Sequence, residues 1–83
     1  MCNNFGGVFM NKKRRQQIKD VIAKLEELEE LVQNMLDEEQ EAFENMPEGL
    51  QQSDNGITSE EAQENLDAAI DALEEAISYL EEI

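Results

Sequence analysis

The spacing of apolar residues constrains the fold of this chain more than any other feature. Between residues 11 and 46 no glycine or proline interrupts the sequence, and apolar side chains recur in steps that are mostly three or four residues long. This spacing is typical of an amphipathic α-helix, because it gathers the apolar side chains on one stripe. The apolar positions are Ile18, Val21, Ile22, Leu25, Leu28, Val32, Met35, Leu36, Phe43 and Met46.

The ends of this first helix carry recognisable signals. Asn11 is a favourable N-cap residue, and Pro47 disfavours helical backbone at the residue before it. The sequence therefore predicts a helix over about residues 12–46, followed by a loop over 47–58. Within that loop, Asn55 and Gly56 predict a turn, since both residues tolerate positive φ. Thr58 and Glu61 then predict a capping box that starts the second helix.

A second helix is predicted over about residues 59–82. Its apolar residues alternate in steps of four and three, which is the spacing of a heptad seam. Ile70 and Ile77 widen that seam, and the many alanines indicate a close approach to the neighbouring helix. The sequence therefore predicts an all-α fold, an antiparallel two-helix hairpin over residues 11–83. The seam residues are Ala62, Leu66, Ala69, Leu73, Ala76, Leu80 and Ile83.

Antiparallel pairing in this register places Leu36 near Ala69 and Leu25 near Leu80. The first helix then extends beyond the second, which ends about level with Ile22, and leaves Ile18 and Val21 without cover from the same chain. A core of this size is marginal without a disulfide, a metal or self-association, and Cys2 is the only cysteine. We therefore expect a homodimer that forms a four-helix bundle, with apolar contacts to the second copy or to another partner at Ile18, Val21 and Ile22.

Charge is distributed unevenly along the chain. Six basic residues and 21 acidic residues give a net charge of −15. All six bases lie between Lys12 and Lys24, whereas residues 25–83 contain twenty acids and no base. Such a segment would be repelled by a nucleic-acid backbone or an anionic membrane, and it favours a basic partner protein. No run of 18 apolar residues predicts a membrane span, and a secretory signal is not recognisable, so we expect a cytoplasmic protein.

The acids of both helices are predicted to lie outside the seam, where they form an acidic ridge. Nine acids lie between residues 60 and 82 and nine between 26 and 44, which approaches the charge density of duplex DNA, one charge per ~1.7 Å. Alternatively, these acids form no more than a solvated helix face, because Glu is a good helix former and is common in exposed helices. The absence of Glu–Lys pairs four residues apart, which stabilise ordinary helices, favours mimicry of DNA. The predicted partner-binding residues are Glu60, Glu64, Asp67, Asp71, Glu75, Glu82, Asp37, Glu38, Glu41 and Glu44.

Three further features have two interpretations each. The Lys12–Arg15 cluster is either a contact site, for phosphate or for an acidic surface, or it is a solvated helix start or an arm that lies on the acidic face of a second copy. Glu39 lies on the predicted seam, and we expect it at a wet edge near Asn65, because burying a lone carboxylate is expensive. Tyr79 is expected to pack partly against the first helix, with a partner contact as the alternative.

Catalysis and cofactor binding find no support in the sequence. There is no histidine, no nucleophile beside a base and no glycine-rich phosphate loop. The loop around Gly56 lacks the carboxylates that a calcium loop requires at its first and last positions. We expect no enzyme activity, no metal and no cofactor. Residues 1–10 are expected to form a flexible N-terminal arm, and Met10 is an alternative start of translation.

Two stretches, "NMPEGLQ" and "AIDALEEAISYLEE", resemble short acidic helical proteins of phages and mobile elements of Gram-positive gut bacteria. The resemblance covers about residues 11–83 and implies an anti-CRISPR or anti-restriction inhibitor that imitates DNA in the host cytoplasm. It also implies a target such as Cas9, whose nucleic-acid channel is basic. The alternative is a non-enzymatic, homo-oligomeric adaptor or structural protein of a phage or mobile element that binds through Ile18 and Val21.

Overall fold

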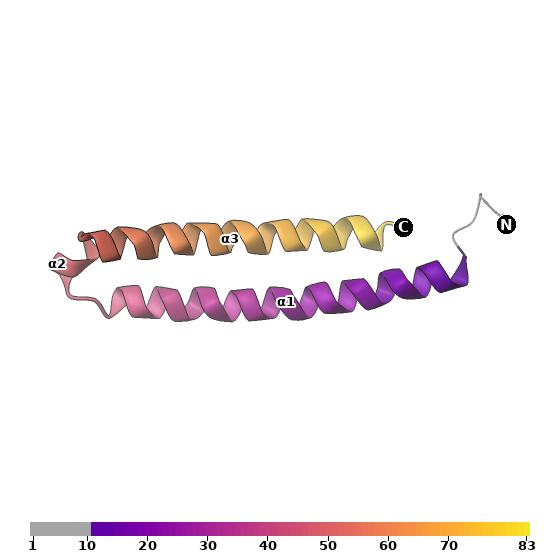
Figure 1. Ribbon diagram of the computed structural model, residues 1–83, viewed down its shortest axis with the longest axis horizontal. Coiled ribbons are helices and arrows are strands. Elements are labelled where there is room, and N and C mark those ends of the chain that lie inside the picture. Colours follow the sequence, from indigo (N-terminus) through magenta and orange to yellow (C-terminus); the bar gives the residue numbers. More distant parts are fainter. Residues whose placement is uncertain (1–10) are drawn as a thin grey trace.

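Residues 11–83 are described by the computed structural model, and they fold into two long helices and one short one (Figure 1). Helix α1 covers Lys12–Glu44, α2 covers Glu48–Gln51 and α3 covers Asp54–Glu81. No strand occurs in this part of the chain, so the all-α prediction is confirmed. The predicted arm, the alternative start at Met10 and Cys2 lie outside the described residues.

Helices α1 and α3 run antiparallel along each other, and α2 closes one end of the pair (Figure 1). The fold is a thin rod with extents of 64 × 15 × 14 Å and a radius of gyration of 19.6 Å. A compact chain of this length would have a radius of gyration of about 12 Å. The rod therefore has very little interior, and almost every residue lies on or near a surface.

Helix α1 begins as its sequence predicts. The side chain of Asn11 accepts a 2.7 Å hydrogen bond from the backbone N–H of Arg14, which satisfies one of the donors that a helix start leaves unpaired. At the other end, Asn45 is the C-cap and Pro47 follows in extended backbone. Helix α1 therefore ends within two residues of the predicted boundary.

The predicted loop over 47–58 and its turn are wrong. Residues 48–51 form α2, and α3 begins at Asp54 after the N-cap Ser53, so Asn55 and Gly56 lie in its first turn. Thr58 and Glu61 lie inside α3 and do not cap it. Asp54 supplies the negative charge that favours a helix start. Asn and Gly are tolerated in a first turn, where the backbone N–H groups have no helical partner in any case.

Gly56 is required where the connection meets α3. It is buried, and a β-carbon at this position would lie 2.7 Å from the Cα of Gln51 and still closer to its carbonyl group. The side chain of Gln51 also donates hydrogen bonds to the carbonyl oxygens of Phe43, at 3.1 Å, and Met46, at 3.2 Å. Gln51 thereby joins the end of α1 to the start of α3 and fixes the connection.

The inner face of α1, defined as the residues turned toward α3, repeats in steps of four and three. Its members are buried or half-buried, and they include two acids, Glu29 and Glu39. Leu28 and Met35, which the sequence grouped with the core, and Val21, which it left without cover, lie one position before this face and are exposed. The inner face of α1 consists of Ile18, Ile22, Leu25, Glu29, Val32, Leu36, Glu39 and Phe43, and Met46 continues it just after the helix ends.

The inner face of α3 matches the predicted seam in part. Five of the seven seam residues are half-buried, namely Ala62, Leu66, Leu73, Ala76 and Leu80, whereas Ala69 and Ile83 are exposed. Ile70 and Ile77, which were predicted to widen the seam, are buried. Burying isoleucine removes more apolar surface from water than burying alanine, so the helix is rotated to bury the isoleucines. Leu80 lies with Ile18 and Ile22 at one end of the pair, which is nearer to the start of α1 than the predicted pairing with Leu25. The inner face of α3 consists of Gly56, Ser59, Gln63, Leu66, Ile70, Leu73, Ile77 and Leu80.

Candidate binding surfaces

The two long helices divide the rod into two chemically different sides. Each residue of an α-helix is rotated by about 100° from the one before it, so its rotation from the inner face follows from its number. Because both helices are right-handed and run in opposite directions, residues with the same rotation from the inner face lie on the same side of the pair. The sequence can therefore be mapped onto two sides.

The acidic side comprises one flank of the pair and the outward surfaces of both helices. Nine of the ten predicted partner-binding residues map to this side, and all ten are exposed. Glu38 is the exception in position, because its rotation places it toward the opposite side. The acidic side is made of Glu60, Glu61, Glu64, Asp67, Asp71, Glu74, Glu75, Glu81 and Glu82 of α3, and Glu26, Glu27, Glu30, Asp37, Glu41 and Glu44 of α1.

The density of exposed charge is close to the density that the sequence predicts. Two of the eighteen acids in the two acidic stretches, Glu29 and Glu39, are half-buried on the inner face of α1. The other sixteen are exposed. The two stretches are about 30 Å long at 1.5 Å per residue, which corresponds to about one exposed carboxylate per 2 Å. This value is close to the charge spacing of a DNA duplex, ~1.7 Å.

Glu29 is an acid whose position the sequence analysis did not anticipate. It lies on the inner face of α1 and hydrogen-bonds with Glu74 of α3. Partial burial raises the pKa of Glu29 above its ordinary value of 4.5, and the hydrogen bond and the repulsion from Glu74 and Glu26 raise it further. A shared proton would stabilise this carboxyl pair. The step of four residues from Leu25 was the signal that placed Glu29 on the inner face.

The carboxylate of Glu39 has a different neighbour from the one predicted. Its carboxylate accepts a 2.5 Å hydrogen bond from the hydroxyl of Ser59, and the amide of Gln63 lies 3.4 Å from the same hydroxyl. Asn65, the predicted neighbour, is exposed and maps to the other flank of α3. The half-buried carboxylate therefore sits in a small polar layer between the helices, and not at a wet edge.

The apolar side, opposite the acidic side, was missed by sequence reasoning. It is formed by Val21, Leu28, Leu31 and Met35 of α1 and by Ala72 and Tyr79 of α3. The four α1 residues are between 46% and 53% exposed, and Tyr79 is 65% exposed. The signal was present in the sequence, because Val21, Leu28 and Met35 recur every seven residues one position before the inner face.

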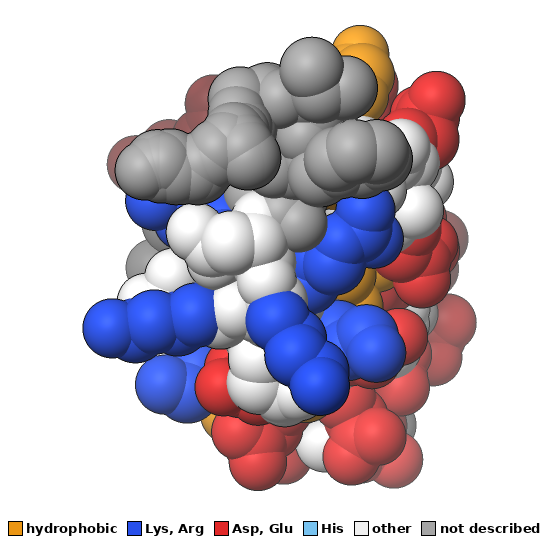
Figure 2. Space-filling model, turned by 90° about the vertical axis from the view of Figure 1, so that its right-hand side faces the viewer, with side chains coloured by type: hydrophobic (Ala, Val, Ile, Leu, Met, Phe, Trp, Pro, Cys, Tyr) orange, Lys and Arg blue, Asp and Glu red, His pale blue; other side chains and the backbone are white. Residues whose placement is uncertain are grey.

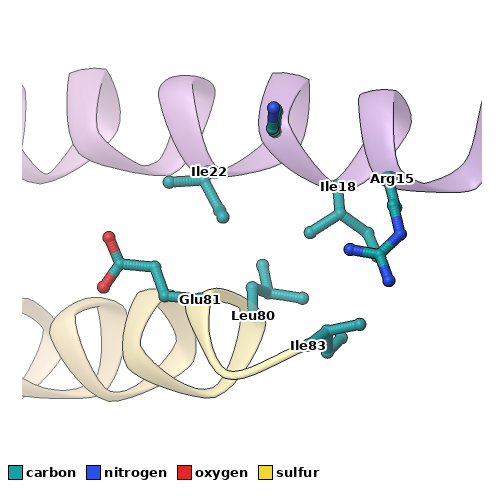
Figure 3. A pocket seen from close by; sticks show the side chains of 7 residues that line it. Arg15, Ile18, Ile22, Leu80, Glu81 and Ile83 are labelled. Carbon is teal, nitrogen blue, oxygen red and sulfur yellow. The ribbon is translucent and has the colours of Figure 1, made fainter. Parts of the chain in front are cut away.

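The open end of the rod has a shallow groove between α1 and α3 (Figure 3). Ile18, Ile22, Leu80 and Ile83 form its apolar lining, and its volume is about 340 Å³. Ile18 and Ile22 are therefore covered in part by α3, contrary to the prediction that Ile18 lacks cover within the chain. Of the three predicted apolar contact residues, only Val21 remains exposed.

Positive charge gathers at this open end. Figure 2 shows the Lys and Arg side chains clustered there, with Asp and Glu side chains beside them. Lys12, Lys13 and Arg14 are exposed in the first turn of α1, where positive charge opposes the helix dipole. The rod is therefore polarised along its length, with bases at the open end and acids along the remainder.

Residues 11–83 thus form an all-α rod with one acidic and one apolar side. Within these residues, no group of three or more metal-ligating side chains is arranged to hold an ion. None of the described helices has the length and apolarity that crossing a membrane requires. The chain matches no protein-family model, and searches of curated proteins and of solved structures found no significant match.

Proposed function

We propose that this chain is a non-enzymatic inhibitor whose acidic side occupies the basic nucleic-acid groove of a host defence nuclease, as a mimic of DNA. One observation carries the proposal: the two long helices, lying side by side, together expose about one carboxylate per 2 Å of their length. No lysine or arginine follows Lys24 in the sequence to neutralise them. A groove lined with basic residues to receive phosphates offers such a surface the same attraction that it offers DNA.

The shape and rigidity of the rod support this function. The charges are carried on helices that pack along each other, so they are held in a line before binding. A preorganised charged surface loses little conformational freedom when it binds. In a four-helix homodimer, the two acidic sides would face outward and double the surface available to the target.

The proposed target class is an RNA-guided nuclease such as Cas9, in the cytoplasm of a bacterial host. Such a nuclease holds nucleic acid in a positively charged channel through backbone contacts rather than through sequence. An inhibitor that occupies this channel needs matching charge density and does not need base-like chemistry. The acidic side provides charge density of this kind.

Capture from host lysate tests this proposal. The tagged chain is used to isolate its partner, and nuclease activity of the partner is then measured with increasing amounts of wild-type chain. A variant with Glu60, Glu64, Asp71, Glu75 and Glu82 all changed to Lys should lose inhibition, while circular dichroism shows intact helices. Leu28→Gln/Met35→Gln, on the apolar side, is the control and should still inhibit the partner. Full inhibition by the five-Lys variant would exclude charge mimicry.

A homo-oligomeric adaptor or structural protein of a phage or mobile element is the second candidate. The apolar side favours it, because exposed apolar surface of this extent marks a site of protein contact. The two functions predict opposite results in the same experiment. An adaptor would lose its partner in the Leu28→Gln/Met35→Gln variant and keep it in the five-Lys variant.

A further inference from the structure

The apolar side is large for a chain with so small a core. Only Leu36, Ile70 and Ile77 are buried hydrophobic residues among residues 11–83, whereas Val21, Leu28, Leu31, Met35 and Tyr79 remain about half exposed or more. The rod is 64 Å long and 15 Å wide, so one of its sides is large enough for a standard interface, about 800 Å² per partner. The apolar side therefore has the chemistry of an interface, and it lies on a side of the rod that has the area of one, with its half-exposed residues of α1 between Val21 and Met35.

Little on this side opposes close packing of a second pair of helices. Ala69, Ala72 and Ala76 keep the α3 half of the surface shallow, and small side chains allow helix axes to approach closely. Of the charged residues, only Arg14, Lys24 and Glu38 map to this side by their rotation from the inner faces. All three are exposed.

The positions of Lys24 and Glu38 indicate which partner fits. Each lies seven residues, about two helical turns, from Leu31, on opposite sides of it. A second copy of α1, placed antiparallel and centred on Leu31, would bring Lys24 of each copy beside Glu38 of the other. A partner of another kind would need its own acid and base at matching positions. The sequence thus carries a self-complementary charge pattern at the centre of the apolar side.

We propose that two copies of this chain pair through their apolar sides with Leu31 at the two-fold axis and the open end of one copy beside the closed end of the other. The charge distribution of the rod favours this orientation. It places the six bases of each copy beside the acid-rich closed end of its partner. The parallel orientation would instead bring together two acid-rich ends that contain no base. Like charges held close together oppose association.

Sedimentation equilibrium tests the interface. The wild-type chain should form a dimer with twice the 9.5 kDa mass of one chain. Leu28→Gln/Met35→Gln should raise the dimer Kd at least about tenfold, since these changes remove apolar surface from the interface. The matched control, Glu30→Gln/Asp37→Asn, changes two residues of α1 on the acidic side and should leave the dimer intact. A monomeric wild-type chain at millimolar concentration, or an unchanged Kd in the apolar-side variant, would overturn the proposal.

A charge exchange tests the orientation. Lys24→Glu and Glu38→Lys each place like charges together in the antiparallel dimer, so each single variant should dimerise at least about threefold more weakly. The double variant restores both pairs and should recover the wild-type Kd. Both positions are exposed, so circular dichroism should show unchanged helices. A double variant as weak as the two single changes combined would exclude this orientation, whether or not the chain inhibits a nuclease.

Discussion

Ser59 on α3 donates a 2.5 Å hydrogen bond to the carboxylate of Glu39 on α1, and Ser59 is the one buried polar side chain among residues 11–83. The contact links the two long helices close to their closed end. It also explains why an acid is tolerated on the inner face of α1, since a partly buried carboxylate requires a donor. The relationship fixes the register of α3 against α1 with a polar contact that an apolar core alone would not specify.

Removing this donor should destabilise the helix pair. Ser59→Ala leaves the Glu39 carboxylate without its partner, and we expect a loss of about 1–2 kcal/mol in the free energy of unfolding. Urea denaturation followed by circular dichroism measures this, with every variant at the same protein concentration because association would shift the midpoint. Ser59→Ala/Glu39→Met should recover most of the loss. If the single variant matches the wild type, the hydrogen bond contributes nothing to stability.

The close approach between Gly56 and Gln51 predicts that alanine substitutions at two glycines differ in their effect on stability. Gly56→Ala should cost about 1–3 kcal/mol, because the added methyl group would collide with the backbone of Gln51. Gly49→Ala is the matched control, since a β-carbon there meets nothing within 4 Å. Thermal unfolding of both variants checks the prediction. Equal midpoints would show that the connection does not pack as tightly as described.

The rotation of α3 predicts which apolar residues carry stability. Ile70→Val should cost about 1 kcal/mol, because it removes a methylene group from a buried site. Ala69→Ser, one position earlier on an exposed surface, should change stability by less than about 0.5 kcal/mol. Chemical denaturation measures both. The reverse order would indicate that α3 turns Ala69 inward, as in the predicted seam.

The Glu29–Glu74 pair predicts stability that rises toward mildly acidic pH. The folded chain holds the pKa of Glu29 above its ordinary value of 4.5, so folding favours the protonated form. That contribution is fully present below about pH 4.5 and is lost as the pH rises through the raised pKa. Melting temperatures from pH 4 to pH 7 should therefore fall with pH, and less steeply in Glu29→Gln. Glu27→Gln, on the exposed acidic side, is the control and should keep the steeper wild-type dependence.

Local signals in the sequence were sufficient to predict the two long helices and the ends of α1, but not α2, the start of α3 or the rotation of the helices. Asn11 and Pro47 mark the ends of α1 because a side-chain cap and a proline act within one turn of backbone. The face that α3 turns inward depends instead on competition between two stripes, one centred on Ala69 and one on Ile70. That competition is decided by tertiary burial, and larger side chains win it.

The acidic side was predictable because charge was read directly from the sequence, and nine of its ten predicted residues map to it. The apolar side was not, because Leu28 and Met35 were counted as core, although only the rotation of α1 against α3 determines whether they are covered. The polar layer around Glu39 was misplaced for a different reason. Its partner Ser59 was assigned to the start of a helix that in fact begins at Asp54.

Displacement of DNA tests most directly whether the nuclease recognises the acidic side as nucleic acid. Fluorescently labelled duplex DNA is bound to the captured nuclease, and the chain is added at salt concentrations between 50 and 300 mM, a range around physiological ionic strength. We expect the wild-type chain to displace the DNA, because the two compete for one groove. The affinity of the chain for the nuclease should also fall steeply as the salt concentration increases. Binding of the chain to the nuclease with the DNA retained, or an affinity insensitive to salt, would contradict mimicry of DNA.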